Sequence, residues 1–206
     1  MGGMGTLGVG SGRQTGVIAG DALDLIAGIP TKSLDLVATD PPYAFGGDGA
    51  EHELSATVAV VLREAALRVK AGGHMVTMMA SSWRSTSYAV EAVRGVMTPT
   101  RIGTWVKPAA KSKVRTPGWA WATVNVLVFR RGKATTGTAV DDLDWISCPP
   151  VGGGRRAELP SAVADWAVAP YATAGGWGLD PFAGSGALVD AMSRAGMDAL
   201  GFELDP

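Results

Sequence analysis

Strand candidates alternate with helix candidates along most of this chain. The apolar segments that predict strands are "GVIAG", "LDLVATD", "HMVTMMA", "RIGTWVK", "WATVNVLVF", "GWGLD" and "DALGFEL". Helical spacing or composition predicts helices at "DALDLIAGI", with Asp21 as N-cap, over residues 53–70, 85–96 and 160–168, and from residue 185 onward. Because this alternation favours a mostly parallel sheet with helices on both faces, the sequence predicts an α/β fold.

Glycine, proline and a lack of apolar periodicity predict where these elements end. Gly72 and Gly73 are expected to stop the helix over residues 53–70. Residues 107–118 and 131–154 are rich in loop-forming residues, so both segments are expected to be surface loops.

Composition bounds the domain count, the compartment and the metal chemistry. The chain has 206 residues, 47% of them hydrophobic, and we expect one domain over residues 16–206 after a mobile Gly-rich tail over residues 1–15. No apolar run approaches the roughly 18 residues of a membrane span and no signal-peptide pattern opens the chain, so we expect a cytoplasmic protein without membrane contact. The single cysteine, Cys148, and the two histidines, His52 and His74, argue against disulfides and metal sites.

Positive charge is concentrated in one part of the chain. The formal net charge of −1 argues against a generally basic nucleic-acid-binding protein. Residues 101–160 nevertheless hold ten Lys or Arg against four Asp or Glu, which gives +6 there and −7 in the remainder. Such a segment attracts phosphates in some proteins and is a solvated face with neutralising pairs in others.

Asp40, Pro41, Pro42 and Tyr43 follow the strand candidate "LDLVAT". The two prolines contribute carbonyl oxygens but no backbone N–H, so the turn offers hydrogen-bond acceptors and few donors. Asp40 adds a carboxylate and Tyr43 a flat aromatic face. The alternative interpretation is a plain turn, since Asp and Pro both favour turns.

A second segment, "GLDPFAGSG", predicts a strand that ends in Asp180, turns through Gly184 and Gly186, and opens a helix. Glu203 ends the next strand candidate. In doubly wound folds a glycine turn lets a ligand approach the backbone, and an acid about twenty residues later accepts hydrogen bonds from ribose hydroxyls. The spacing fits a nucleoside, although such a turn can also serve helix–strand packing alone.

Together, "DPPY" at residues 40–43 and "DPFAGSG" at residues 180–186 resemble the motifs of the DNA amino-methyltransferases that modify adenine N6 or cytosine N4. Their order, with the catalytic motif first and the cofactor motif last, resembles the circularly permuted β group. The resemblance extends over about residues 16–206, including "GTWVKP", "VNVLVFRRGK" and "GFELDP". It implies a Rossmann-like methyltransferase fold in which the two motifs lie at the carboxyl ends of neighbouring strands.

The resemblance also implies S-adenosylmethionine as the methyl donor. In it, Asp21 contacts the cofactor adenine, Glu203 binds the ribose, and a helix flanked by Arg156, Leu159 and Pro160 closes over the methionine end. The cofactor-binding residues implied in this way are Asp21, Arg156, Leu159, Pro160, Asp180, Pro181, Phe182, Ala183, Gly184, Ser185, Gly186 and Glu203.

An exocyclic amine is a poor nucleophile because its lone pair is delocalised into the base. Two acceptors, the Asp40 carboxylate and the Pro41 carbonyl, are expected to bind its protons and direct its lone pair at the methyl group, with Pro42 completing the turn. Tyr43 is expected to stack on a base flipped out of its duplex. No covalent intermediate is needed, so Cys148 is expected to be idle.

Double-stranded DNA is the partner that the resemblance implies, with phosphate contacts expected from basic residues of the loop over residues 107–118: Lys107, Lys111, Lys113 and Arg115. Adenine N6 is the preferred target because Asp begins the first motif. Cytosine N4 methylation, RNA methylation and a catalytically inactive nucleic-acid-binding protein stay open as alternatives. A homo-oligomer or a specificity partner, and a role in restriction–modification, are compatible with the same motifs.

Overall fold

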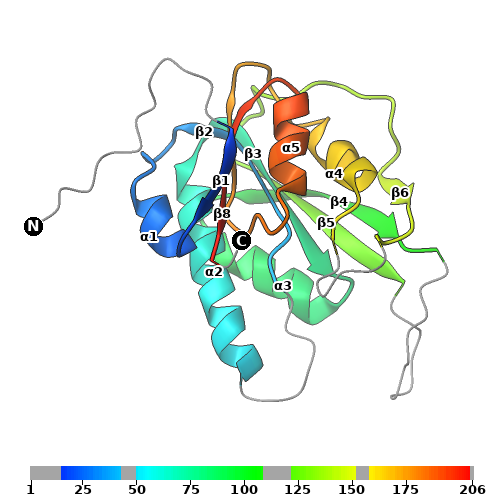
Figure 1. Cartoon of the computed structure of the whole chain (residues 1–206), viewed down its shortest axis with the longest axis horizontal. Helices are drawn as coiled ribbons and strands as arrows, with labels where there is room; N and C mark the ends of the chain where they lie inside the picture. The colour runs from blue at the N-terminus through cyan, green and yellow to red at the C-terminus, as the bar shows by residue number, and fades with distance from the viewer. Residues whose placement is uncertain (1–14, 43–49, 109–121, 152–157, 205–206) are drawn as a thin grey trace, which may run out of the picture.

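Eight strands form one sheet in the part of the chain that this computed structural model describes, residues 15–42, 50–108, 122–151 and 158–204 (Figure 1). Their spatial order is β1 (Gly16–Ala19), β8 (Asp198–Glu203), β7 (Trp177–Asp180), β2 (Leu34–Thr39), β3 (Val69–Ala80), β5 (Thr123–Arg130), β4 (Thr98–Val106) and β6 (Trp145–Ser147). All neighbours are parallel except that β5 runs antiparallel to β3 and β4. The predicted α/β fold with a mainly parallel sheet is confirmed.

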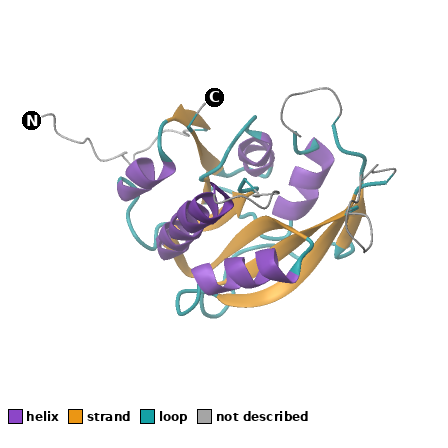
Figure 2. Cartoon of the chain, turned by 90° about the horizontal axis from the view of Figure 1, so that it is seen from below, coloured by secondary structure: helices purple, strands orange, loops and turns teal. Residues whose placement is uncertain are grey.

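Helices cover both faces of this sheet (Figure 2). One core lies under α1 (Ala22–Ala27), α2 (Ala50–Arg68) and α3 (Trp83–Ala92), and the other under α4 (Ser161–Val168) and α5 (Ala187–Arg194). None of the described helices combines the length and the apolar character that a membrane crossing requires.

Strand β2 explains why the sheet needs helices on both sides. All six of its residues are buried, with Val37 in the first core and its neighbours Leu36 and Ala38 in the second. Successive side chains of a strand point to opposite faces, so a nearly continuous apolar run is stable only when both faces are covered.

The prediction that Gly72 and Gly73 stop a helix is wrong. Helix α2 ends at Arg68, and both glycines lie inside β3. The β2–β3 pairing shifts there, because Leu34 faces Val69 whereas Leu36 faces His74. Gly72 has a φ of +86°, and a Cβ at Gly73 would lie 2.7 Å from the backbone oxygen of Asp35. The glycines are needed for this bulge in the strand.

Two other boundaries differ from the prediction. Helix α3 begins at Trp83, because the Ser82 hydroxyl accepts a hydrogen bond from Ser85 N at 3.1 Å, and it ends at Ala92. The loop predicted over residues 131–154 contains β6, which pairs with β4 through Thr104 and Trp145. A strand of three residues is too short to show an alternating pattern.

Candidate functional site

Acidic residues gather at the carboxyl edge of the sheet. The strands β1, β8, β7 and β2 are parallel neighbours, and each is followed by or ends in an acid, namely Asp21, Glu203, Asp180 and Asp40. The sequence predicted that Asp40 and Asp180 would share this edge, and the pairing of β2 with β7 confirms it. Neither these acids nor any other three His, Cys, Asp or Glu side chains in the described ranges are grouped so that they could hold a metal ion.

Asp180 lies deepest of these acids, with 1% of its surface exposed. Its Oδ1 accepts a hydrogen bond from Phe182 N at 3.0 Å. Burial raises the pKa of this carboxyl to about 7, the Thr39 hydroxyl and Phe182 N lower it, and the charges of Asp40 and Glu203 raise it further. The Thr39 Oγ1 has no hydrogen-bond partner of ordinary distance and angle, and the effect of burial outweighs its influence on the Asp180 carboxyl. The pKa of Asp180 is therefore shifted from the usual acidic range towards neutral pH.

The glycine turn after Asp180 exposes backbone beside these acids. Gly184 has a φ of +50° and Gly186 a φ of +87°, both in the left-handed region that favours glycine. Gly184 N donates to Glu203 Oε2 at 2.8 Å, which joins the turn to the end of β8. A Cβ at Gly184 would meet nothing within 4 Å, so a ligand can approach the backbone at this point. Gly186 then caps the eight-residue helix α5.

The other predicted residues of this turn divide into buried and accessible ones. Pro181 and Ala183 are buried, Phe182 is half-buried and Ser185 is exposed. Ala183 N donates to the Phe202 carbonyl at 2.9 Å, which fixes the turn against β8. The accessible part of the motif is therefore Phe182 and the stretch from Gly184 to Ser185.

The acceptor turn lies beside the glycine turn, on the next strand. Asp40 is half-buried, Pro41 is buried and Pro42 is exposed, while Tyr43 falls outside the described residues. Val37 of β2 is paired with Leu179 of β7. Asp180 is thus about level with Ala38, two residues before Asp40, and the charge of Asp40 acts on it.

The remaining predicted cofactor residues lie on either side of these two turns. Asp21 is exposed and caps α1, with its Oδ1 accepting from Leu23 N at 2.7 Å. On the other side of the sheet, Pro160 is buried at the start of α4 and Leu159 packs against the second core. Arg156 lies outside the described residues.

Of the four basic residues expected to contact phosphate, Lys107 lies in the described chain, and Lys111, Lys113 and Arg115 lie outside it. Lys107 is half-buried, with its Nζ 5.3 Å from the centroid of the Trp105 ring. Trp105 is buried, and its Nε1 donates to the Cys148 carbonyl at 2.8 Å.

A polar network at the same edge was missed by the sequence prediction. Thr123 Oγ1 donates to Ser81 Oγ at 2.9 Å, Ser81 Oγ donates to Asn125 Oδ1 at 3.0 Å, and Asn125 Nδ2 donates to Thr86 Oγ1 at 3.3 Å. Because β5 is antiparallel to β3, with Val124 opposite Ala80, its first residues reach the carboxyl edge. The signal in the sequence is the amide of Asn125 inside an otherwise apolar strand.

A cavity of about 360 Å³ lies away from the acids, between β4, β5, α4 and residues 138–144. Its walls include the apolar residues Val126 and Val128 and the polar residues Arg101, Tyr171 and Asp144. It contains none of the predicted site residues, so the acidic edge and this cavity are separate features.

The sequence matches no protein-family model and no curated protein sequence. Its structure is similar to that of PvuII DNA methyltransferase (cytosine-N4-specific), with a TM-score of 0.76, 16% identity, and coverage of 94% of this chain and 84% of that one. It is also similar to M1.HpyAVI, with a TM-score of 0.71, 20% identity, and coverage of 92% of each chain. A structure of M1.HpyAVI in complex with S-adenosylmethionine gives the same score and identity over 91% of this chain and 92% of that one.

These similarities cover 92–94% of this chain and 84–92% of the solved ones. The chain therefore has the α/β fold of solved DNA methyltransferases.

Proposed function

We propose that this protein transfers a methyl group from S-adenosylmethionine to the exocyclic amine of a base flipped out of double-stranded DNA. The observation that carries the proposal is the position of the Asp40–Pro41 turn and the Gly184–Gly186 turn at the carboxyl ends of the adjacent strands β2 and β7. In open α/β sheets, ligands bind in the crevice outside these ends. The similar structures support the choice, since one is a DNA methyltransferase and another holds S-adenosylmethionine.

The residues at this edge fit S-adenosylmethionine. The backbone of Gly184 is open to a close approach, and Glu203 is held against it at the end of the next strand, where a ribose hydroxyl can donate to its carboxylate. Asp21, just after β1, would contact the cofactor adenine. Asp180 stabilises the glycine turn by accepting a hydrogen bond from Phe182 N. When bound, the cofactor supplies an electrophilic methyl group.

Asp40 and Pro41 would then act on the target amine. The carboxylate and the proline carbonyl accept hydrogen bonds from its two protons, which draws the nitrogen towards a tetrahedral shape and frees its lone pair for attack. The lack of N–H groups at Pro41 and Pro42 is useful here, because a donor would repel the amine protons. Tyr43 would stack on the extruded base, with Lys107, Lys111, Lys113 and Arg115 at the phosphates.

Adenine N6 is the preferred target in this proposal, because Asp40 begins the acceptor motif as it does in the adenine-directed members that the sequence resembles. Cytosine N4 is the second candidate, favoured by the similarity to a cytosine-N4-specific structure. The purified protein should be incubated with unmethylated duplex DNA and S-adenosylmethionine carrying an isotopically labelled methyl group, and the nucleosides analysed by mass spectrometry.

The proposal predicts labelled N6-methyladenine. Labelled N4-methylcytosine would overturn the base preference and keep the reaction. Label in RNA but not in DNA would overturn the substrate class. An absence of label in both, with DNA binding that is the same in wild type and Asp40→Ala, would show a binding protein without this activity.

A further inference from the structure

Trp83 has an unusual position for a tryptophan. Its side chain is 87% exposed, more than that of any other large hydrophobic residue in the described chain. An exposed indole lacks the burial in the core that normally makes this side chain stabilising. A single exposed apolar residue is common on protein surfaces, so its surroundings decide whether it has a function.

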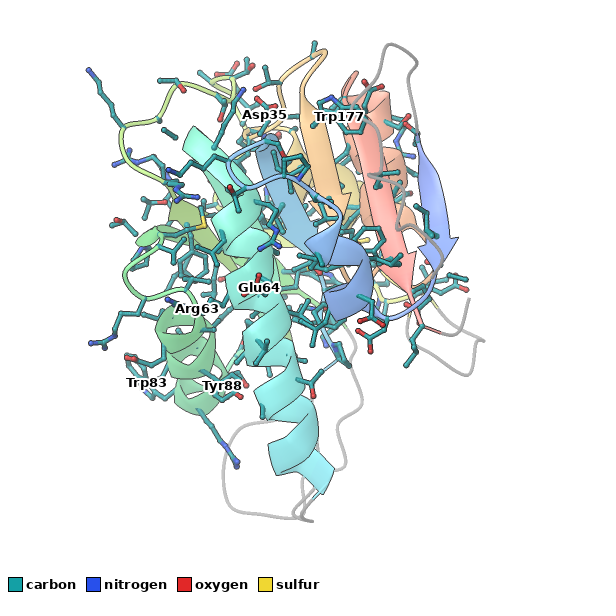
Figure 3. The ribbon with its side chains drawn as sticks, turned by 90° about the vertical axis from the view of Figure 1, so that its left-hand side faces the viewer. Asp35, Arg63, Glu64, Trp83, Tyr88 and Trp177 are labelled. Atoms are coloured by element: carbon teal, nitrogen blue, oxygen red, sulfur yellow. The ribbon has the colours of Figure 1, made fainter. Side chains whose placement is uncertain are left out.

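Trp83 follows the end of β3, which extends beyond the carboxyl end of β2. Strand β3 is the parallel neighbour of β2, with Thr39 paired with Thr77, and it continues for three residues to Ala80. At about 3.3 Å per residue, β3 reaches about 10 Å farther out than the end of β2. Figure 3 shows Trp83 towards one end of the molecule and Asp35 and Trp177 together at the other. A duplex that inserts a base beside Asp40 must lie outside this edge, at the level of Trp83.

Hydrogen bonds fix the backbone around Trp83, although the side chain of Trp83 is exposed. The Ser82 hydroxyl caps α3 by accepting from Ser85 N, and the Ser87 hydroxyl donates to the Trp83 carbonyl at 2.6 Å. The polar network that starts at Ser81 joins the same corner to β5. An exposed aromatic side chain on a fixed backbone loses little conformational entropy on binding.

Positive charge lies next to Trp83. Arg84 is exposed beside it, and the first turn of α3 holds no acidic residue. The amino end of a ten-residue helix adds a positive partial charge. Positive charge beside an exposed indole suits a nucleic-acid base and its flanking phosphate.

We infer that Trp83 stacks on a DNA base next to the flipped nucleotide, in the space that the departing base leaves. This inference rests on the proposed function, because only a base that leaves its stack exposes the faces of its neighbours. Aromatic stacking on an unstacked base does not require a particular base, so Trp83 would hold the opened duplex rather than read its sequence.

The test compares Trp83→Ala, Trp83→Phe and the control Trp145→Ala, whose tryptophan is 51% exposed on the edge strand β6. Fluorescence anisotropy measures the Kd for a short labelled duplex with one mismatched adenine, at several salt concentrations. Trp83→Ala should raise Kd about 5-fold to 150-fold, the range expected for loss of one stacked base. The slope of log Kd against log salt should not change, since no phosphate contact is removed. Trp83→Phe should restore most of the affinity, and Trp145→Ala should bind like the wild type.

Arg84→Ala should instead reduce the slope of log Kd against log salt, because it removes a phosphate contact. The inference is overturned if Trp83→Ala binds DNA as tightly as the wild type, or if this variant changes the salt slope but not the Kd at fixed salt. It is overturned too if Trp145→Ala raises Kd as much as Trp83→Ala does. It is also overturned if sedimentation shows that Trp83→Ala dissociates an oligomer without weakening DNA binding.

Methyl transfer measured in parallel separates the two proposals. If the wild type binds the mismatched duplex through Trp83 but labels no nucleoside, the proposed function fails and the stacking contact stands. If the wild type labels DNA and Trp83→Ala has the same KM for DNA, the stacking inference fails and the function stands. Circular dichroism should give the same unfolding temperature for all the Trp83 variants, because the side chain is exposed.

Discussion

Two aspartates are buried at opposite ends of the central strands, and their carboxylates have very different partners. Asp35, near the start of β2, is 4% exposed. Its Oδ1 lies 2.5 Å from Lys70 Nζ, and its Oδ2 accepts from Trp177 N at 3.0 Å (Figure 3). Asp180, at the end of β7, is at least as deeply buried but receives a backbone N–H from Phe182 and no cation in the described structure.

The surroundings of Asp180 increase this difference, because Asp40 and Glu203 bring further negative charge to it. A buried carboxylate with a cation and a donor is a structural group. A buried carboxylate among other acids is costly, and such groups are common at functional sites, where a bound ligand can supply the missing partners. Changes at the amino end should therefore affect stability alone, and changes at the carboxyl end should also affect ligand binding or turnover.

The largest expected effect is on turnover at the carboxyl end. Asp40→Ala should lower kcat for methyl transfer about 100-fold to 1000-fold, the loss typical of removing one group that stabilises a transition state. Cofactor binding, measured by calorimetry, should not change, because Asp40 faces the base in this account. A kcat within tenfold of the wild type would contradict the catalytic role.

Asp180 should make the stability of the protein depend on pH. Its folded-state pKa of about 7 is raised above the ordinary 3.8, so the protonated form stabilises the fold at low pH and this contribution is lost as the pH rises through about 7. Asp180→Asn should remove this loss of stability at higher pH. The free energy of unfolding of this variant relative to wild type should increase by about 2 kcal/mol between pH 5 and pH 7. Urea titrations at both pH values measure it, and an equal difference at the two would rule out the raised pKa.

Lys70→Met tests the amino end with a change that keeps the apolar stem of the side chain. It leaves Asp35 buried without its cation and should lower the free energy of unfolding by about 1–2 kcal/mol. This is less than the 3–5 kcal/mol of a fully buried pair, because Lys70 is 40% exposed. The kcat measured well below the unfolding temperature should equal that of the wild type. A change in kcat without a change in stability would reverse the assignment of the two ends.

The smallest effect is expected at the glycine turn, where Gly184→Ala can be matched with Gly132→Ala. The two glycines have φ angles of +50° and +67°, and a Cβ at either meets nothing within 4 Å. Both variants should lose similar stability, about 1 kcal/mol, from the left-handed conformation. Gly184→Ala alone should weaken S-adenosylmethionine binding, about tenfold, because its Cβ occupies the space of the ligand. Equal affinities in calorimetry would place the cofactor elsewhere.

Much of the acidic edge was predictable from the sequence, because it depends on local patterns. Each of Asp21, Asp40, Asp180 and Glu203 stands next to an apolar strand candidate, and the carboxyl ends of parallel strands share one edge. The motifs therefore indicated which side chains would meet without knowledge of the exact register.

The errors arise where the structure depends on distant pairing. Gly72 and Gly73 carry a helix-stop signal, and only their pairing with β2 makes them a strand bulge. The bonds between Ser81, Thr123 and Asn125 require an antiparallel β5. Neither can be read from local periodicity. The exposure of Trp83 likewise depends on how far β3 extends beyond β2.

A crystal structure of the protein with S-adenosylmethionine tests the central claim most directly. The account predicts that the adenosine lies against Gly184 and Glu203, with the sulfur-bound methyl group turned towards Asp40 across a gap that admits one base. Density for the ligand in the cavity beside Arg101 and Val126 would contradict it, as would a ligand at Gly184 whose methyl group points away from Asp40.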